Sequence, residues 1–406
     1  MTKGATTRLT IGFLPLVDAC LPILAHEHGF AEDEGLELTF MRDVSWATVL
    51  DRLLYGHSDA AHMLAPLAIA TALGRGRPAQ ELAAPVVLGL NGNAFTVSNA
   101  LAEALGTGGE LGDPEMMGQR LKEVAAARKA EGQKLRFGVV HRYSSHNYML
   151  RYWLAGVGVL PDKDVEIVTI APPFSADALK AGEIDGSCVG EPWNSIAVEQ
   201  GAGQIVLATA QIWRRGVEKV LALRAERLKE IPPAIEGLIS AVRRAGEHFV
   251  DPDNWDTNAA ILARPEYCDA SHTLVRRAIS DRLVLSQGGA VREYPDFMFQ
   301  YHEAANFPWV SQAEWLYSQL VRWDGLEYDA EQAAAAARVF RPGVYRSALA
   351  GSNDPLPTAS SKVEGSVSEA LHASTQNGTI LLENNTFFDG KSFDPDALEA
   401  YIAAQK

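Results

Sequence analysis

The sequence predicts an α/β fold with two lobes, each built on a mostly parallel β-sheet flanked by helices. Strand and helix patterns alternate over the first ninety residues, and a similar unit follows from residue 135 to a helix after Trp193. Such alternation is typical of parallel sheets covered by helices. Because the scheme occurs twice in one chain, we expect two lobes that face each other across a cleft.

In the first unit, β-rich runs alternate with amphipathic runs. Strands are expected at residues 9–13, 36–40 and 59–63, and helices at residues 19–27, at 46–55 and from Pro66, which stands where proline favours a helix start. In the second unit, strands are expected at 135–140, 165–170 and 184–189, with helices at 147–154, at 175–181 and after Trp193. Residues 92–99 and 204–213 are the predicted crossovers between the lobes.

These patterns divide the chain into four parts. Residues 1–98 form the first part of lobe 1, and residues 99–212 form lobe 2. Residues 213–341 return to lobe 1 and are mostly helical. Residues 342–406 form a C-terminal extended segment and a short helix, and the Ala, Ser, Gly and Pro content of residues 342–376 predicts partial disorder there.

Composition narrows the classes of function. A hydrophobic content of 47% with 21% charged residues is typical of an ordered globular protein. The formal charge of −15 argues against direct nucleic-acid binding, which needs clustered Lys and Arg. No apolar run of about 18 residues occurs, so membrane insertion is not expected.

The compartment predicted from the sequence is the cytoplasm. Residues 9–25 come nearest to a signal peptide, but Pro15, Asp18 and Pro22 interrupt the run and no small-residue cleavage site follows. Three widely spaced cysteines, residues 20, 188 and 268, have no metal-binding or CxxC spacing and are read as buried thiols. That reading favours a reducing compartment.

The segment LRFGVVHRYSSHNYMLRYWLAGVG, residues 135–158, carries the clearest local signal. A strand ends near His141, a polar turn holds Ser144 and Ser145, and a helix follows. The free N–H groups at the start of that helix and its positive dipole end suit a small anion. Capping alone is the alternative role of the two serines. The chain shows no nucleophile elbow, HExxH or P-loop motif, so we expect neither an enzyme nor a cofactor.

Several motifs together resemble the nitrate- and bicarbonate-binding proteins of the NrtA/CmpA type, and most closely the cytoplasmic nitrate sensors of the NasS type. They run in the family's order over nearly the whole chain: IGFLPLVDA (11–19), VSWATVLDRL (44–53), DAAHMLAP (59–66), NGNAFTV (91–97), HRYSSHNYMLRYWL (141–154), GEPW (190–193), TAQIWRRGVEKVLAL (209–223) and FFDGKSFDP (387–395). The resemblance implies the bilobal, type II periplasmic-binding-protein-like clamp.

The resemblance also implies a set of ligand-binding residues. The tryptophan that packs against the ion falls on Trp46, the histidine closing the second-lobe strand on His141, and the family's lysine on Lys219. The polar amide falls on Asn91, where the family has glutamine, and the segment around His62 resembles the sensor type. For Trp46 and His62, packing in the core is the alternative role.

The lysine and the histidine are expected to make the polar contacts that bind the ligand. Lys219 supplies a charge and His141 a donor, and charge-assisted hydrogen bonds are the strong ones. Glu191 and Trp193 are read as a cleft rim or hinge, with Glu191 in a salt bridge; calcium at Glu191 is a weaker alternative, so no metal is assigned.

Two functional roles follow from the resemblance. The first is a cytoplasmic sensor that holds an RNA-binding antiterminator of the NasT type without ligand and releases it when nitrate or nitrite binds, which controls nitrate-assimilation genes. The second is the substrate-binding component of an ABC-type nitrate or bicarbonate importer. An enzymatic role like that of the thiamine-precursor synthases lacks the cysteine-rich segment it needs. The choice among nitrate, nitrite and bicarbonate stays open.

Overall fold

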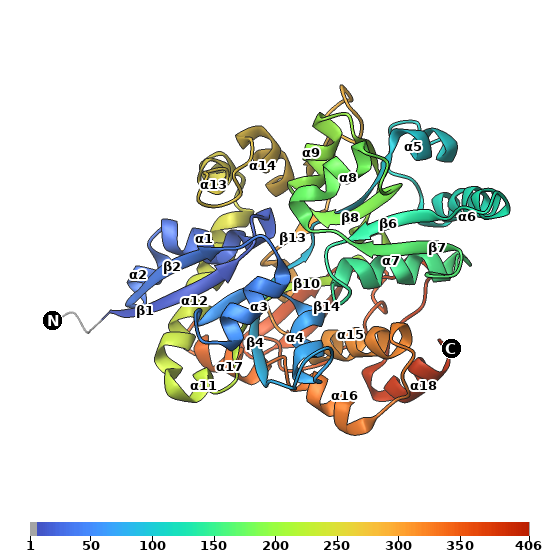
Figure 1. Cartoon of the computed structure of the whole chain (residues 1–406). Coiled ribbons are helices and arrows are strands. Elements are labelled where there is room, and N and C mark those ends of the chain that lie inside the picture. The colour runs from blue at the N-terminus through green and yellow to red at the C-terminus, as the bar shows by residue number, and fades with distance from the viewer. Residues whose placement is uncertain (1–5, 406) are drawn as a thin grey trace.

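Two β-sheets with helices on their faces form the part of the chain that the computed structural model describes, residues 6–405 (Figure 1). The first sheet has the strand order β13-β4-β10-β3-β1-β2, with β1 Thr7–Phe13, β2 Leu36–Arg42, β3 Ala60–Leu64, β4 Leu82–Asn91, β10 Val217–Arg224 and β13 Met298–Phe299. The second has the order β7-β6-β8-β5-β9, with β5 Asn93–Ser98, β6 Leu135–Val139, β7 Val165–Thr169, β8 Gly186–Gly190 and β9 Gly203–Ala208. The α/β class with two sheets is confirmed.

Both sheets are mixed, which corrects the expectation that they are mostly parallel. β1 pairs in parallel with β2 and β3, and β6 with β7 and β8, but β10 and β5 run antiparallel to both of their neighbours. β4 and β5 are separated by Gly92 alone, so the chain passes straight from one sheet into the other. A strand that enters a sheet at the end where its neighbours finish must run against them, and β5 and β10 both enter in this way.

Helices of the first sheet come from two stretches of the chain, residues 20–72 and 227–279. They are α1 Cys20–Glu27, α2 Phe30–Asp33, α3 Trp46–Leu54, α4 Ala65–Ala72, α11 Arg227–Glu230, α12 Pro232–Val250, α13 Trp255–Leu262 and α14 His272–Ile279. α3 and α4 pack on β3, whereas α12 packs on α1 and β2. The strong apolar face of α3 (Val49, Leu50 and Leu53) is buried against the sheet, as its helical spacing predicts.

The second sheet carries α5 Asn99–Leu105, α6 Pro114–Ala130, α7 Ser145–Gly156, α8 Ser175–Lys180, α9 Trp193–Glu199 and α10 Thr209–Ile212. α7 is capped by Ser144 and buries Trp153 completely. Within residues 6–405, every helix is too short or too polar to span a bilayer.

The C-terminal part is more regular than expected. α15 Val310–Trp323, α16 Ala330–Ala337, α17 Pro342–Ala348 and α18 Leu398–Ala403 are helices, and β14 Leu371–Thr375 pairs with β15 Gly378–Leu382 in a hairpin. Residues 342–376 thus contain one helix and one strand, and residues 349–370 between them form no regular element, as an extended segment would. Few large apolar residues occur there, but Tyr345, Leu349 and Leu356 are all buried.

The chain from α15 to its C-terminal segment contacts the helices of both sheets. α15 packs against α4 and also against α7. Phe387 stacks on Trp213, with ring centroids 4.8 Å apart, and the amide of Phe388 donates to the carbonyl of Ile212 over 2.8 Å. This segment therefore ties the end of α10 to the helices that follow the first sheet.

Candidate functional site

A cluster of five ionisable side chains lies buried where the two sheets meet. Asp18 belongs to the loop after β1, His62 to β3, and Glu218 and Lys219 to β10. His146 is the second residue of α7, so it reaches the cluster from the second sheet. The side chains of all five are exposed by 6% or less, which makes their charges strongly dependent on one another.

Strand register explains why the lysine and His62 meet. Lys219 lies opposite Leu64 in the antiparallel β10–β3 pair, and His62 lies two residues before Leu64. Residues two apart on a strand share a face, so Lys219 and His62 project to the same side of the sheet. Asp18 approaches that side from the carboxyl end of β1, where open α/β sheets usually hold their ligands.

Ion pairs join the five side chains into a chain of contacts. Nζ of Lys219 lies 2.7 Å from Oδ2 of Asp18 and 2.7 Å from Oε1 of Glu218. Each carboxylate also faces one histidine: Nε2 of His62 lies 2.9 Å from Oδ1 of Asp18, and Nδ1 of His146 lies 3.0 Å from Oε1 of Glu218.

These contacts decide the protonation states. Burial alone would raise the pKa values of Asp18 and Glu218, but Lys219 and the histidines outweigh it and hold both below their usual range. Burial opposes the charge on Lys219, yet the two carboxylates raise its pKa. For His62, burial lowers the pKa in spite of Asp18. The lysine and both carboxylates are thus charged at neutral pH, whereas His62 is neutral.

Three nitrogen atoms in or beside the cluster are buried and have neither a hydrogen-bond nor an ion-pair partner among the described residues: Nε1 of Trp46, Nδ1 of His62 and Nε2 of His146. The Trp46 ring lies against two members of the cluster, with its centroid 5.2 Å from that of His62 and 5.4 Å from Nζ of Lys219. Buried donors without acceptors are costly. A small flat oxyanion would supply acceptors to the Trp46 indole and, once His62 is protonated, to its imidazole.

The start of α7 supports this site. Oγ of Ser144 accepts the amide proton of Asn147 over 3.2 Å and donates to the carbonyl of His141 over 2.8 Å, so Ser144 is the N-cap. Oγ of Ser145 donates to the carbonyl of Glu218 over 3.4 Å, which links α7 to β10. The positive end of the α7 dipole therefore lies next to the cluster.

The structure does not bring His141 into the cluster, and His146 takes the place expected for it. β6 ends at Val139, and the turn after it leaves His141 half-buried, with its Nδ1 accepting the amide proton of Tyr143 over 3.0 Å. Burial and the nearby Arg142 lower the pKa of His141 to about 4. His141 is thus neutral at neutral pH and lies at the edge of the turn.

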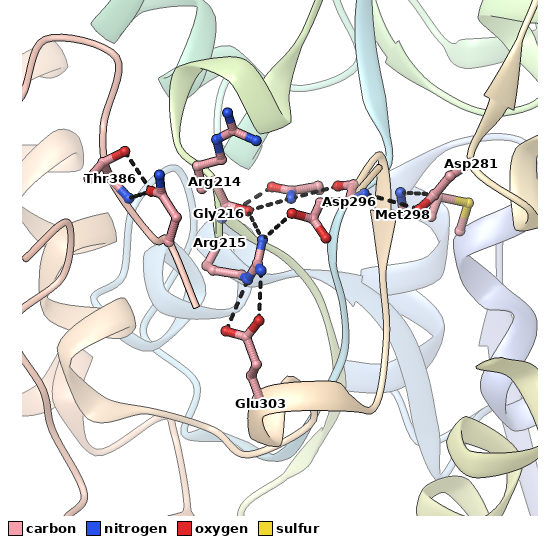
Figure 2. A network of polar contacts seen from close by, with 10 residues as sticks. Arg214, Arg215, Gly216, Asp281, Asp296, Met298, Glu303 and Thr386 are labelled. Atoms are coloured by element: carbon pink, nitrogen blue, oxygen red, sulfur yellow. Dashed lines mark hydrogen bonds and ion pairs between the residues drawn. The ribbon is translucent and has the colours of Figure 1, made fainter. Parts of the chain in front are cut away.

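Asn91 is also placed differently from the expectation. Its amide donates to the carbonyls of Arg214 and Asp296, over 2.8 and 3.1 Å, and its Oδ1 accepts from the amide of Gly216 over 3.1 Å. With these three bonds the side chain joins the end of β4 to the start of β10, and it has no free group for a ligand. Figure 2 shows the neighbouring Arg215 held between Asp296 and Glu303.

Glu191 and Trp193 lie at the junction of the sheets. The carbonyl of Glu191 accepts from the amide of Val17 over 2.9 Å, and its carboxylate accepts from the amide of Ser195 over 3.3 Å. No ion pair to Glu191 occurs among residues 6–405, so the expected salt bridge is corrected; burial raises its pKa to about 7. Trp193 is half-buried at the start of α9.

Comparison with known proteins places this geometry in a family. The chain is 30% identical over 410 residues to the nitrate/nitrite binding protein NrtA of Synechococcus elongatus, a match that covers 98% of this chain and 86% of that protein. The crystal structure of the periplasmic nitrate-binding protein NrtA from Synechocystis PCC 6803 matches with a TM-score of 0.85 and 25% identity, over 99% of this chain and 100% of that one. The nitrate import ATP-binding protein NrtC of Synechocystis is 32% identical over 339 residues, but the chain spans only 49% of its length.

The two-sheet architecture and these matches define a solute-binding protein with the periplasmic-binding-protein-like fold. A model of the NMT1-like family matches residues 2–263, more than half of the chain, and the chain belongs to that family and to the NrtA/CmpA-type family. The resemblance and the fold class predicted from the sequence are confirmed.

Three members of the cluster escape the sequence reasoning: Asp18, His146 and Glu218. Each carries a signal in the sequence. Asp18 follows the first predicted strand, Glu218 directly precedes the chosen lysine, and His146 stands in the first turn of the predicted helix. Carboxylates are not expected beside an anion, and Asp18 and Glu218 are present because they hold the lysine and the histidines in place.

Proposed function

We propose that this protein binds nitrate or nitrite at the buried cluster of Asp18, His62, His146, Glu218 and Lys219. The observation that carries the proposal is the combination of one buried ammonium group with three unpartnered nitrogen atoms. A trigonal oxyanion has its hydrogen-bond acceptors in one plane. A charged donor placed beside neutral donors offsets the hydration that the anion loses on binding. The names of the NrtA relatives support the same ligand class.

We infer further that the protein acts as a cytoplasmic sensor of the NasS type. In this role the ligand-free form holds a NasT-type antiterminator, and ligand binding releases it. A ligand can shift an open–closed equilibrium only by its differential affinity for the two forms. Residues from both sheets meet in the cluster, so ligand contacts depend on how the lobes are arranged. The sensor-like segment around His62 supports this role.

The second candidate is the substrate-binding component of an ABC-type importer. One relative favours it, because the name of NrtC is that of a nitrate import protein. The two roles share one ligand site and differ in the partner. Capture of partners by the full chain with and without nitrate distinguishes them: a regulator released by nitrate supports the sensor, and a membrane permease supports the importer.

The ligand site itself is tested by calorimetric titration of the full chain with nitrate. His146→Ala should weaken binding by about 1.5–3 kcal/mol, the range for one hydrogen bond to a charged group. His141→Ala is the matched control, because His141 lies five residues away on the same turn but outside the cluster, and it should leave the affinity unchanged. Equal losses in both variants, or a loss only in His141→Ala, would contradict the site.

A further inference from the structure

A cavity that is separate from the ionisable cluster lies between residues 296–304 and the C-terminal segment. Its volume is about 490 Å³, within the range usual for small-molecule sites. None of the five cluster residues lines it. Its wall is formed largely by apolar side chains, among them Phe299, Tyr301, Leu356, Ile380 and Leu381.

Four carboxylates also line this cavity: Asp296, Glu303, Asp354 and Glu383. Three of them already have a guanidinium partner. Arg215 contacts Asp296 at 2.9 Å and Glu303 at 2.6 Å, as Figure 2 shows. Arg243 also lines the wall and pairs with Asp354.

A ligand in this cavity would meet the carboxylate oxygens that have no partner. Glu383 is exposed and has no ion pair within residues 6–405. Asp354 is only 8% exposed, and its Oδ2 has no hydrogen-bond partner among the described residues. Four carboxylates against two guanidinium groups leave the wall negative, so the cavity favours a positive charge.

The aromatic side chains of the wall also favour a positively charged ligand. Arg215 lies over the ring of Phe299, 3.9 Å from its centroid, and Arg243 lies over the ring of Tyr301 at 5.2 Å. Ring faces attract cations, so this wall already stabilises flat cationic groups. The backbone at Tyr301, Glu303 and Ala304 has φ between 54° and 62°, a costly conformation for these residues that is enriched at ligand sites.

We propose that this cavity binds a small organic cation, an ammonium or guanidinium group carried on an apolar body. The charged end lies near Asp354 and Glu383, and the body packs between the aromatic wall and the β15 residues Ile380 and Leu381. Neither the anion site nor the proposed sensor role is needed for this binding.

The test uses benzylamine as probe and benzyl alcohol as its neutral isostere, with binding to the full chain followed by ligand-observed NMR. Benzylamine should bind with roughly millimolar affinity, as its size allows, and the alcohol at least about threefold more weakly. Ile380→Trp, which fills the cavity, should remove benzylamine binding. Thr379→Trp, an exposed neighbour on β15 outside the cavity, should leave it unchanged.

A second variant guards against misfolding of Ile380→Trp. Glu383→Gln changes only an exposed side chain and should narrow the preference for benzylamine over benzyl alcohol. The proposal is overturned by equal binding of the two probes, by no binding of benzylamine at millimolar concentration, or by binding that survives Ile380→Trp in a folded protein. His146→Ala should leave benzylamine binding unchanged, which keeps this result distinct from that of the nitrate titration.

Discussion

Nitrate binding at the cluster should be linked to proton uptake. Asp18 and Glu218 are charged and so is Lys219, which leaves a formal charge of −1 on a buried site before any ligand arrives. Nitrate carries no proton at neutral pH and would add a second negative charge. Uncompensated buried charge is very costly, so groups at such sites change protonation instead.

His62 is the group that can take up the proton. Its Nε2 faces Asp18, and its Nδ1 is buried without a partner among the described residues. A neutral imidazole whose proton faces the carboxylate offers the ligand only a lone pair, which repels an anion. The imidazolium form donates from both nitrogens. We therefore expect at least one proton to enter with each nitrate ion.

The sign and size of the pH effect follow from the pKa of His62. Burial lowers it in the free protein, and a bound anion would raise it. Affinity is then fully present below the free-state pKa and falls as pH rises towards the bound-state pKa. One proton corresponds to a tenfold change per pH unit, about 1.4 kcal/mol.

Calorimetry in two buffers with different heats of ionisation counts the protons directly. Between about pH 6 and pH 8, where imidazoles titrate, the observed enthalpies should differ by the buffer difference multiplied by about one proton. His146→Ala should reduce the affinity, while His141→Ala serves as control. Equal enthalpies in both buffers together with a pH-independent affinity would refute the reasoning.

Three further predictions concern the framework of the site. Asn91→Ala removes three hydrogen bonds at a residue with φ of 62° and should lower the free energy of unfolding in urea by about 2–4 kcal/mol; a loss confined to nitrate affinity would contradict this framework role. Phe387→Ala removes the stack on Trp213 and should cost about 3–5 kcal/mol, so an unchanged melting temperature would argue against the observed packing. Ser45→Ala deletes the cap that accepts from Thr48 and should cost about 1 kcal/mol in urea denaturation, whereas Ser45→Asp should retain most of that stability.

The alternation of strands and helices predicts most of the fold because it depends on local apolar periods. β1, β2 and β3 and the helices after them lie within a few residues of their expected ranges. The direction of the strands, in contrast, is not predicted by these periods. The antiparallel course of β5 and β10 depends on the end at which the chain enters each sheet, and no local pattern in those strands carries that information.

The candidate site was harder to predict for a similar reason. Trp46, His62, Ser145 and Lys219 do come together: Trp46 and Ser145 begin helices, and His62 and Lys219 lie on the same face of paired strands. His141 and His146 flank the same pair of serines, and only the path of the turn decides which of them faces Glu218. Asn91 has the polar amide expected of a ligand-binding residue. Backbone groups of neighbouring segments, however, take both its nitrogen and its oxygen as hydrogen-bond partners.

The order of strands along the chain has a consequence for folding during synthesis. The second sheet is contiguous in sequence and has all its strands once residue 208 has left the ribosome. The first sheet is still incomplete at that point, because β10, which lies between β3 and β4, has not yet emerged. β13, the edge strand beside β4, emerges last. Domains form as units in the order in which their segments emerge, so the nascent chain exposes the unpaired edges of β3 and β4 to chaperones until residue 224 is available.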